Sequence, residues 1–143
     1  MKSRGLQPVQ KRRVRVRTTH SNPRWPVAPH LLLEALPACH PGERFQSDIN
    51  YIATDQGVLY LAANIDAYSR KCVGWSAADN MESPLVVRAA WRALASVENR
   101  VENAAAHPIH HSDRGSQYAS EIFRDFLRSN GVTQSMSRKA KLL

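Results

Sequence analysis

The sequence Ile109-His110-His111-Ser112-Asp113-Arg114-Gly115-Ser116-Gln117-Tyr118 places a carboxylate and two imidazoles at the end of a short apolar run, just before a helical pattern. An α/β protein commonly carries its reactive groups at such a strand end, where a carboxylate can hold a divalent cation. Gly115 relieves the backbone crowding of a sharp strand-to-helix turn. A second carboxylate is therefore expected upstream. The best candidate is Asp48, a polar residue within Phe45-Gln46-Ser47-Asp48-Ile49-Asn50-Tyr51-Ile52, which otherwise has the pattern of a strand.

Length and charge limit the classes of protein that this chain can represent. At 143 residues it has room for one domain, which would bury about 65–70% of the surface that its unfolded form exposes. The net charge is +8, and residues 1–24 contain no acidic residue but carry Lys2, Arg4, Lys11, Arg12, Arg13, Arg15, Arg17 and Arg24. Such an arm suits a polyanion, and the alternative is a solvated basic tail without a specific partner.

Cysteine usage and hydropathy indicate where the protein works. Cys39 and Cys72 stand alone without a CxxC spacing, which argues against a zinc knuckle or a disulfide framework and for a reduced environment, and we expect both to be structural. No apolar run reaches the roughly 18 residues of a membrane span, and residues 1–17 lack the apolar centre of a signal peptide. We therefore expect a cytoplasmic protein with neither a membrane segment nor a small-molecule cofactor.

The pattern predicts a basic arm and Pro-rich linker over residues 1–41, followed by one α/β core over residues 42–143. Six prolines interrupt any regular structure in the linker region: Pro8, Pro23, Pro26, Pro29, Pro37 and Pro41. The core is expected to run strand, strand, strand, helix, strand, helix, strand over residues 44–54, 58–66, 71–77, 83–97, 107–111, 116–130 and 132–136. Three antiparallel strands followed by strands reached over helices make a mixed sheet with helices on its faces.

Both predicted helices have sequence signals at their ends. Ser83 is expected to be the N-cap of the first, with Pro84 at its first helical position. The second is expected to be continuous, with its stop at Asn130-Gly131 and one apolar side made of Tyr118, Ile122, Phe123, Phe126 and Leu127. Trp75 and Trp91 are assigned to the core. The leucines of residues 29–36 are expected to form a short helical turn that docks on the domain.

Several polar residues of the predicted core have either a structural or a functional role. A lone Asp in a strand usually faces solvent, but Asp48 and Asp113 are expected on one sheet, where they repel each other unless a cation neutralises them. Mg²⁺ or Mn²⁺ fits two carboxylates, water and substrate phosphate. His110 and His111 point to opposite strand faces, which argues against zinc; one is expected to pack in the sheet and the other to contact a phosphate near the site. Asp66 is assigned to turn chemistry rather than to a metal.

Three segments together resemble the retroviral-integrase-like catalytic core of bacterial insertion-sequence transposases of the orfB type: Ser47-Asp48-Ile49-Asn50-Tyr51-Ile52, Asn64-Ile65-Asp66-Ala67-Tyr68-Ser69-Arg70-Lys71-Cys72-Val73-Gly74-Trp75 and His110-His111-Ser112-Asp113-Arg114-Gly115-Ser116-Gln117-Tyr118. The resemblance implies a ribonuclease H-like fold and a DDE active site, in which two Asp and one Glu hold two divalent metals for DNA strand cleavage and transfer. Asp48 and Asp113 match the two Asp positions. DNA contacts are then expected at Lys11, Arg12, Arg13, Arg15, Arg17, Arg114, Arg138 and Lys139.

The resemblance also implies an incomplete site. In the family the Glu lies on a helix after the fifth strand, past the last residue of this sequence, and Glu121 matches no catalytic position. The final helices are likewise expected to be missing. We therefore expect a truncated DDE transposase core of a bacterial, nucleoid-associated protein that is inactive alone. The alternatives are a non-catalytic DNA-binding or assembly module, which joins a second copy or a full-length transposase and interferes with it, and a product without a selected function.

Overall fold

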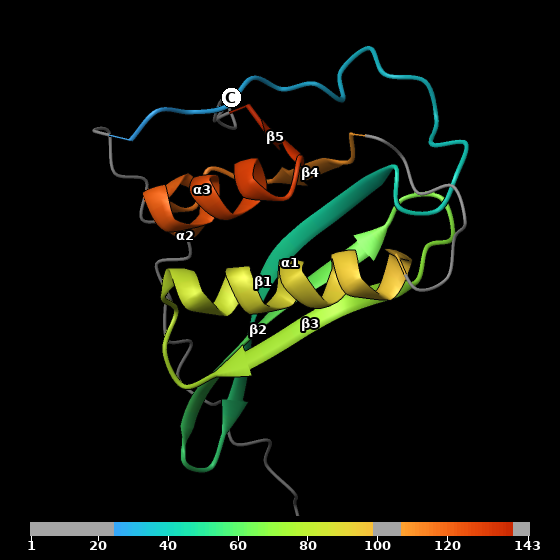
Figure 1. Ribbon diagram of the computed structural model, residues 1–143. Helices are drawn as coiled ribbons and strands as arrows, with labels where there is room; N and C mark the ends of the chain where they lie inside the picture. Colours follow the sequence, from blue (N-terminus) through green and yellow to red (C-terminus); the bar gives the residue numbers. More distant parts are fainter. Residues whose placement is uncertain (1–24, 99–106, 139–143) are drawn as a thin grey trace, which may run out of the picture.

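The chain forms one mixed five-stranded sheet with helices packed against it (Figure 1). The computed structural model describes residues 25–98 and 107–138. The predicted basic arm, the polar stretch of residues 99–106 and the last residues from Lys139 on lie outside the described residues. The elements follow the predicted order: β1 Arg44–Thr54, β2 Gly57–Asp66, β3 Cys72–Ala78, α1 Ser83–Glu98, β4 Ile109–Ser112, α2 Ser116–Ala119, α3 Glu121–Ser129 and β5 Thr133–Met136.

The sheet order is β3-β2-β1-β4-β5, which confirms the predicted mixed sheet. The first three strands form an antiparallel meander. Strand β4 pairs in parallel with β1, and β5 pairs in parallel with β4. Thr54 pairs directly with Gly57, whose φ of 134° closes the tight turn between β1 and β2. This arrangement places β1, which carries Asp48, next to β4, which Asp113 follows, in the interior of the sheet.

The described helices share one face of the sheet and build the core there. The larger core cluster joins apolar residues of α1, α2 and α3 with Ala62 of β2 and Met136 of β5. Gly74 lets α1 lie directly on β3, because a Cβ at this position would be 2.4 Å from the carbonyl oxygen of Ala89. Within residues 25–98 and 107–138, no helix has the length and apolar character that a bilayer span requires.

The second predicted helix is not continuous, and that part of the prediction is wrong. Ser120 lies between α2 and α3 with an extended backbone (φ −62°, ψ 150°). Its hydroxyl donates to the carbonyl of Gln117 (2.7 Å) and accepts from the amide of Phe123 (3.2 Å), so it caps α3. The break also turns Ile122 outward, and this side chain is 60% exposed rather than part of the apolar side. The predicted stop holds, with Asn130 as C-cap and Gly131 at a φ of 66°.

Two other packing predictions are wrong. Trp75 and Trp91 are 54% and 60% exposed rather than buried. Trp75 lies on β3, an edge strand, and is covered by the guanidinium of Arg92, which also donates to the Trp75 carbonyl (2.7 Å).

Leu36, in the stretch expected to dock as a helical turn, is 79% exposed, and the structure has no helix there. The two cysteines, Cys39 and Cys72, are free and exposed.

The linker before β1 is bound to the core along residues 25–41, a segment that we call the strap. It runs past the edge strand β5 (blue to cyan in Figure 1), where the Met136 amide donates to the Pro29 carbonyl (3.2 Å) and the Leu31 amide to the Ser135 hydroxyl (3.0 Å). Near its end, the strap is tied to the start of β1.

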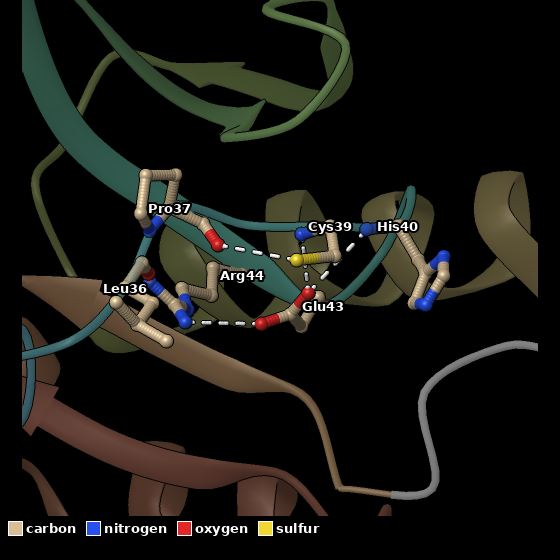
Figure 2. A network of polar contacts seen from close by, with 6 residues as sticks. All are labelled: Leu36, Pro37, Cys39, His40, Glu43 and Arg44. Atoms are coloured by element: carbon tan, nitrogen blue, oxygen red, sulfur yellow. Dashed lines mark hydrogen bonds and ion pairs between the residues drawn. The ribbon is translucent and has the colours of Figure 1, made fainter.

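Figure 2 shows this second tie, a network centred on the Glu43 carboxylate. The carboxylate accepts from the Cys39 amide (2.7 Å) and pairs with Arg44 (3.0 Å), whose guanidinium also donates to the carbonyl of Leu36. The pKa of Glu43 is lowered, mainly by the hydrogen bond from the Cys39 amide. Burial raises this pKa by a smaller amount, and the contacts with Arg44 and His40 lower it further. The strap is therefore fixed to the sheet at both ends.

Candidate active site

Asp48 reaches the surface because β1 alternates its side chains between the two faces of the sheet. Ser47 is buried and Asp48 exposed, as expected for neighbours on a strand whose one face carries the helices. The Asp48 Oδ1 atom accepts a hydrogen bond from the amide of Ile49 (2.8 Å), which fixes the orientation of the carboxylate.

Asp113 follows the last residue of β4 and is half-buried at the turn into α2. Its Oδ1 atom accepts from the amide of Gly115 (2.8 Å). A Cβ on residue 115 would approach this oxygen to 2.9 Å and the Gln117 Oε1 atom to 3.1 Å, so only glycine fits here without displacing the carboxylate. The predicted need for Gly115 is thus explained by close approach to Asp113, since its φ of −56° is open to any residue.

The two carboxylates line the same pocket, which has a volume of about 360 Å³. Its other walls come from the middle of β1, the β3–α1 connection, the β4–α2 turn and α2: Ile49, Asn50, Tyr51, Met81, Gly115, Gln117 and Tyr118. Burial raises the pKa of Asp113 and the negative charge of Asp48 raises it further, although the Gly115 amide acts against both. Burial likewise raises the pKa of Tyr51, and the two carboxylates add to that rise.

The donors at this pocket suit a hard divalent cation. Both side chains offer carboxylate oxygens, and no Lys or Arg in the described part of the chain forms an ion pair with either. Their mutual repulsion is the condition that a bound cation would relieve. Among residues 25–98 and 107–138, however, no third His, Cys, Asp or Glu joins them in a metal-binding group. The described residues therefore offer two carboxylates at this pocket.

The histidines next to Asp113 lie elsewhere. His110 is 2% exposed, packs against Phe123 with ring centroids 5.0 Å apart, and bonds to the Asn64 side chain (2.8 Å). His111 faces the strap on the other side of the sheet, bonded to Ser135 (2.9 Å). The expected core histidine is confirmed, but the other ring does not lie at the site as expected, because it faces the strap; the expected phosphate contact stays a prediction. Neither ring lines the pocket.

Asp66 has the predicted turn role. One carboxylate oxygen accepts from the amide (2.9 Å) and hydroxyl (2.5 Å) of Ser69, and the other from the amide of Gly42 (2.9 Å). Burial alone would raise the pKa of Asp66, but these hydrogen bonds outweigh it and the pKa is lowered. The carboxylate joins Gly42, which directly follows the strap, to the β2–β3 turn.

The predicted basic contacts are only partly described. Arg114, the residue after Asp113, is half-buried, and its Nε donates to the carbonyl of Ser137 (2.8 Å). This hydrogen bond holds the segment just after β5 close to the β4–α2 turn. Arg138 is exposed. The basic arm from Lys11 to Arg17 and Lys139 lie outside the described residues. The structure thus places one predicted basic residue directly next to the site.

Most of the pocket walls are not predicted from the sequence. Gln117 and Tyr118 belong to the motif around Asp113, but the sequence predicts a role only for Tyr118, in helix packing. Met81 gave no signal, because its place depends on contacts across the fold: its carbonyl accepts from Gln117 Nε2 (3.0 Å) and its sulfur from the Tyr51 hydroxyl (3.2 Å).

Comparison with known proteins agrees with this geometry. Residues 38–141 match the model of the family described as "Integrase core domain". The chain belongs to the integrase core domain family. A relative from Shigella sonnei, the "Insertion element IS600 uncharacterized 31 kDa protein", is 39% identical over 130 residues, covering 91% of this chain and 46% of that protein. The transposase for insertion sequence element IS904 of Lactococcus lactis is 40% identical over 111 residues, or 78% of this chain and 42% of the transposase.

A solved integrase core confirms the fold of this integrase core domain. The HTLV-2 integrase catalytic core domain, solved in complex with magnesium, superposes with a TM-score of 0.58 at 18% identity, over 69% of this chain and 62% of that one. The ribonuclease H-like fold expected from the sequence is therefore present. This chain spans less than half the length of the two curated relatives.

Proposed function

We propose that this integrase core domain binds Mg²⁺ or Mn²⁺ through Asp48 and Asp113 and belongs to the machinery that cleaves and joins DNA strands in transposition. The observation that carries the proposal is the convergence of the two carboxylates, from β1 and from the β4–α2 turn, on one pocket where no Lys or Arg of the described residues pairs with them. The family membership and the transposase relatives support DNA as the substrate.

Each residue has a distinct part in this proposal. Asp48 and Asp113 hold the cation, and the amides of Ile49 and Gly115 orient their carboxylates toward it. The cation, when bound, would stabilise the charge that develops on a phosphate during displacement. Arg114 and Arg138, together with the basic arm, would hold the DNA backbone.

We further propose that two carboxylates suffice for metal binding but not for efficient strand cleavage. The family's active site, as the sequence resemblance implies, uses a third carboxylate, and the described residues contain none at the pocket. Losing one ligand group weakens a metal position because fewer oxygens compensate for the water that the ion gives up. This chain alone is therefore expected to nick DNA weakly in the presence of Mg²⁺.

The metal site is tested by titrating the ¹⁵N-labelled chain with Mn²⁺ and following its amide signals. The amides of Ile49 and Gly115 lie directly beside the two carboxylates and are expected to broaden first. Asp113→Asn should abolish this selective broadening. Asp125→Asn, on the exposed side of α3, is the matched control and should leave it unchanged. Equal broadening in the wild type and Asp113→Asn would overturn the metal site.

The DNA role is tested by deleting residues 1–24. Each phosphate neutralised contributes about −0.9 to the slope of log affinity against log salt for duplex DNA. The deleted segment carries eight basic residues, so the slope should fall by up to about 7 in magnitude. An unchanged affinity for DNA would show that the arm does not contribute to DNA binding. Strong metal-dependent nicking by the intact chain, lost in Asp113→Asn, would instead refute the claim of weak cleavage.

A further inference from the structure

The pocket carries a buried hydrogen bond that the proposed chemistry does not use. Tyr118 is 1% exposed, and its hydroxyl lies 2.8 Å from the hydroxyl of Ser47. Both groups are buried, and the ring packs edge-on against Phe123 with centroids 5.5 Å apart. A buried hydroxyl pair of this kind holds its two elements together, because a buried polar group that is left unpaired destabilises the fold.

The position of this pair relative to the carboxylates is specific. Ser47 directly precedes Asp48 on β1, and Tyr118 stands in α2, just after the turn that begins with Asp113. The hydrogen bond therefore links the two elements that carry the carboxylates.

The strands themselves do not make this link. The parallel pairing of β1 with β4 ends at Gln46 and His111, before either strand reaches its carboxylate. Beyond that point no backbone ladder fixes the separation of Asp48 and Asp113. In the described part of the chain, the Ser47–Tyr118 contact is a direct side-chain hydrogen bond between β1 and α2.

The α2 side of the link is itself fixed. The Tyr118 carbonyl accepts from Gln134 Nε2 on β5 (2.6 Å), and Gln117 donates to the Met81 carbonyl (3.0 Å). A shift of α2 would break contacts with β5 and with the β3–α1 connection together. The hydroxyl of Tyr118 thus offers β1 a rigid anchor.

We propose that Ser47 and Tyr118 are positioning residues that set the separation of Asp48 and Asp113 and thereby the affinity of the site for a divalent cation. The inference rests on the proposed metal site. Neither hydroxyl touches the cation; the pair acts through the two carboxylates. Outer groups that orient metal ligands commonly change the affinity by about 10- to 100-fold when removed.

The test compares the apparent Mn²⁺ affinity of Tyr118→Phe, Ser47→Ala and the double variant, read from selective broadening of the Ile49 and Gly115 amides. Tyr118→Phe keeps the ring and its packing, so the fold is expected to persist. Each single variant should lose about 10- to 100-fold in affinity. The double variant should lose no more than the worse single variant, because both remove the same hydrogen bond.

Ser135→Ala is the control for a general loss of stability. It removes a fully buried hydroxyl, bonded to His111 and the Leu31 amide, on the strap side of the sheet. This variant should keep the wild-type Mn²⁺ affinity. If Tyr118→Phe binds Mn²⁺ with wild-type affinity while Asp113→Asn does not bind it, the positioning role is refuted but the metal site is not. Absence of selective broadening in the wild type would overturn both.

Discussion

The adjacent histidines of β4 show how one residue's environment sets its chemistry. His110 is fully enclosed between the sheet and the helices, and its pKa is lowered to about 3, first by burial and then by the nearby His111. Burial and His30, whose ring lies 4.8 Å away, lower the pKa of His111 as well. The sequence could predict that the two rings face opposite sides of a strand, but not that the second side would be covered by the strap.

The buried imidazole makes stability depend on pH. In the unfolded chain a histidine has a pKa of about 6.5, so between that value and about 3 the unfolded state binds a proton that the folded state excludes. The contribution of His110 to the free energy of unfolding should therefore be fully present above pH 6.5 and fall as the pH drops, by up to about 1.4 kcal/mol per pH unit. Urea unfolding at pH 7.5, 5.5 and 4.5 measures this slope.

The matched variant for this prediction is His110→Gln. Its amide retains a donor for Asn64 but does not titrate, so the slope between pH 6.5 and 4.5 should become shallower by about one proton. The lowered pKa of Asp66 also stabilises the folded state, but this contribution is lost only below the ordinary Asp pKa of 3.8. It therefore does not change the slope between pH 6.5 and 4.5. An equally steep slope in His110→Gln would contradict the assignment.

At the scale of elements, helix continuity was the least predictable feature. The apolar spacing of residues 116–130 fits one helix, and nothing in the local pattern requires a break. Tertiary contacts decide it: Tyr118 must reach Ser47, Gln117 must reach Met81, and Phe123 and Leu127 must enter the core. A single straight helix could not serve both sets of contacts, and Ser120 supplies the cap that makes the break stable.

We therefore expect Ser120→Ala to destabilise the protein by about 1–2 kcal/mol, the usual cost of losing an N-cap. The change removes the acceptor for the Phe123 amide and the donor to Gln117, both in a buried place. The free energy of unfolding in urea measures the loss. Ser129→Ala, exposed at the end of the same helix, should change stability by less than about 0.5 kcal/mol; a similar loss in both variants would count against the cap.

For the whole molecule, the sequence predicted the strands and their order along the chain, and it predicted that Asp48 and Asp113 lie near each other. Alternation along β1, the Gly57 turn and the Asp113–Gly115 motif are local signals, and local signals fix local geometry. The pocket walls, the outward Trp75 and Trp91, and the docked strap depend on which segments meet after folding. The sequence pattern does not contain this information, because an exposed edge strand and an edge strand covered by another segment have the same pattern of residues.

The strap gives the last prediction, which tests where the folded core begins. The sequence places the boundary at residue 42, yet residues 25–41 bind the β5 edge through Pro29 and Leu31 and bind the start of β1 through the carbonyl of Leu36. Trp25 and Ala28 also pack against the larger core cluster.

Deleting residues 1–24 should leave the free energy of unfolding nearly unchanged, because that segment is basic and contributes none of these contacts. Deleting residues 1–36 should lower it by about 2–4 kcal/mol, the combined cost of several hydrogen bonds and of exposing apolar surface. Thermal unfolding followed by circular dichroism compares the two chains without relying on Trp25 as a probe. Because Ser135 and Met136 lie directly under the strap, their amides should exchange faster with solvent only in the shorter chain. Equal stability and exchange in the two deletions would place the boundary at residue 42 after all.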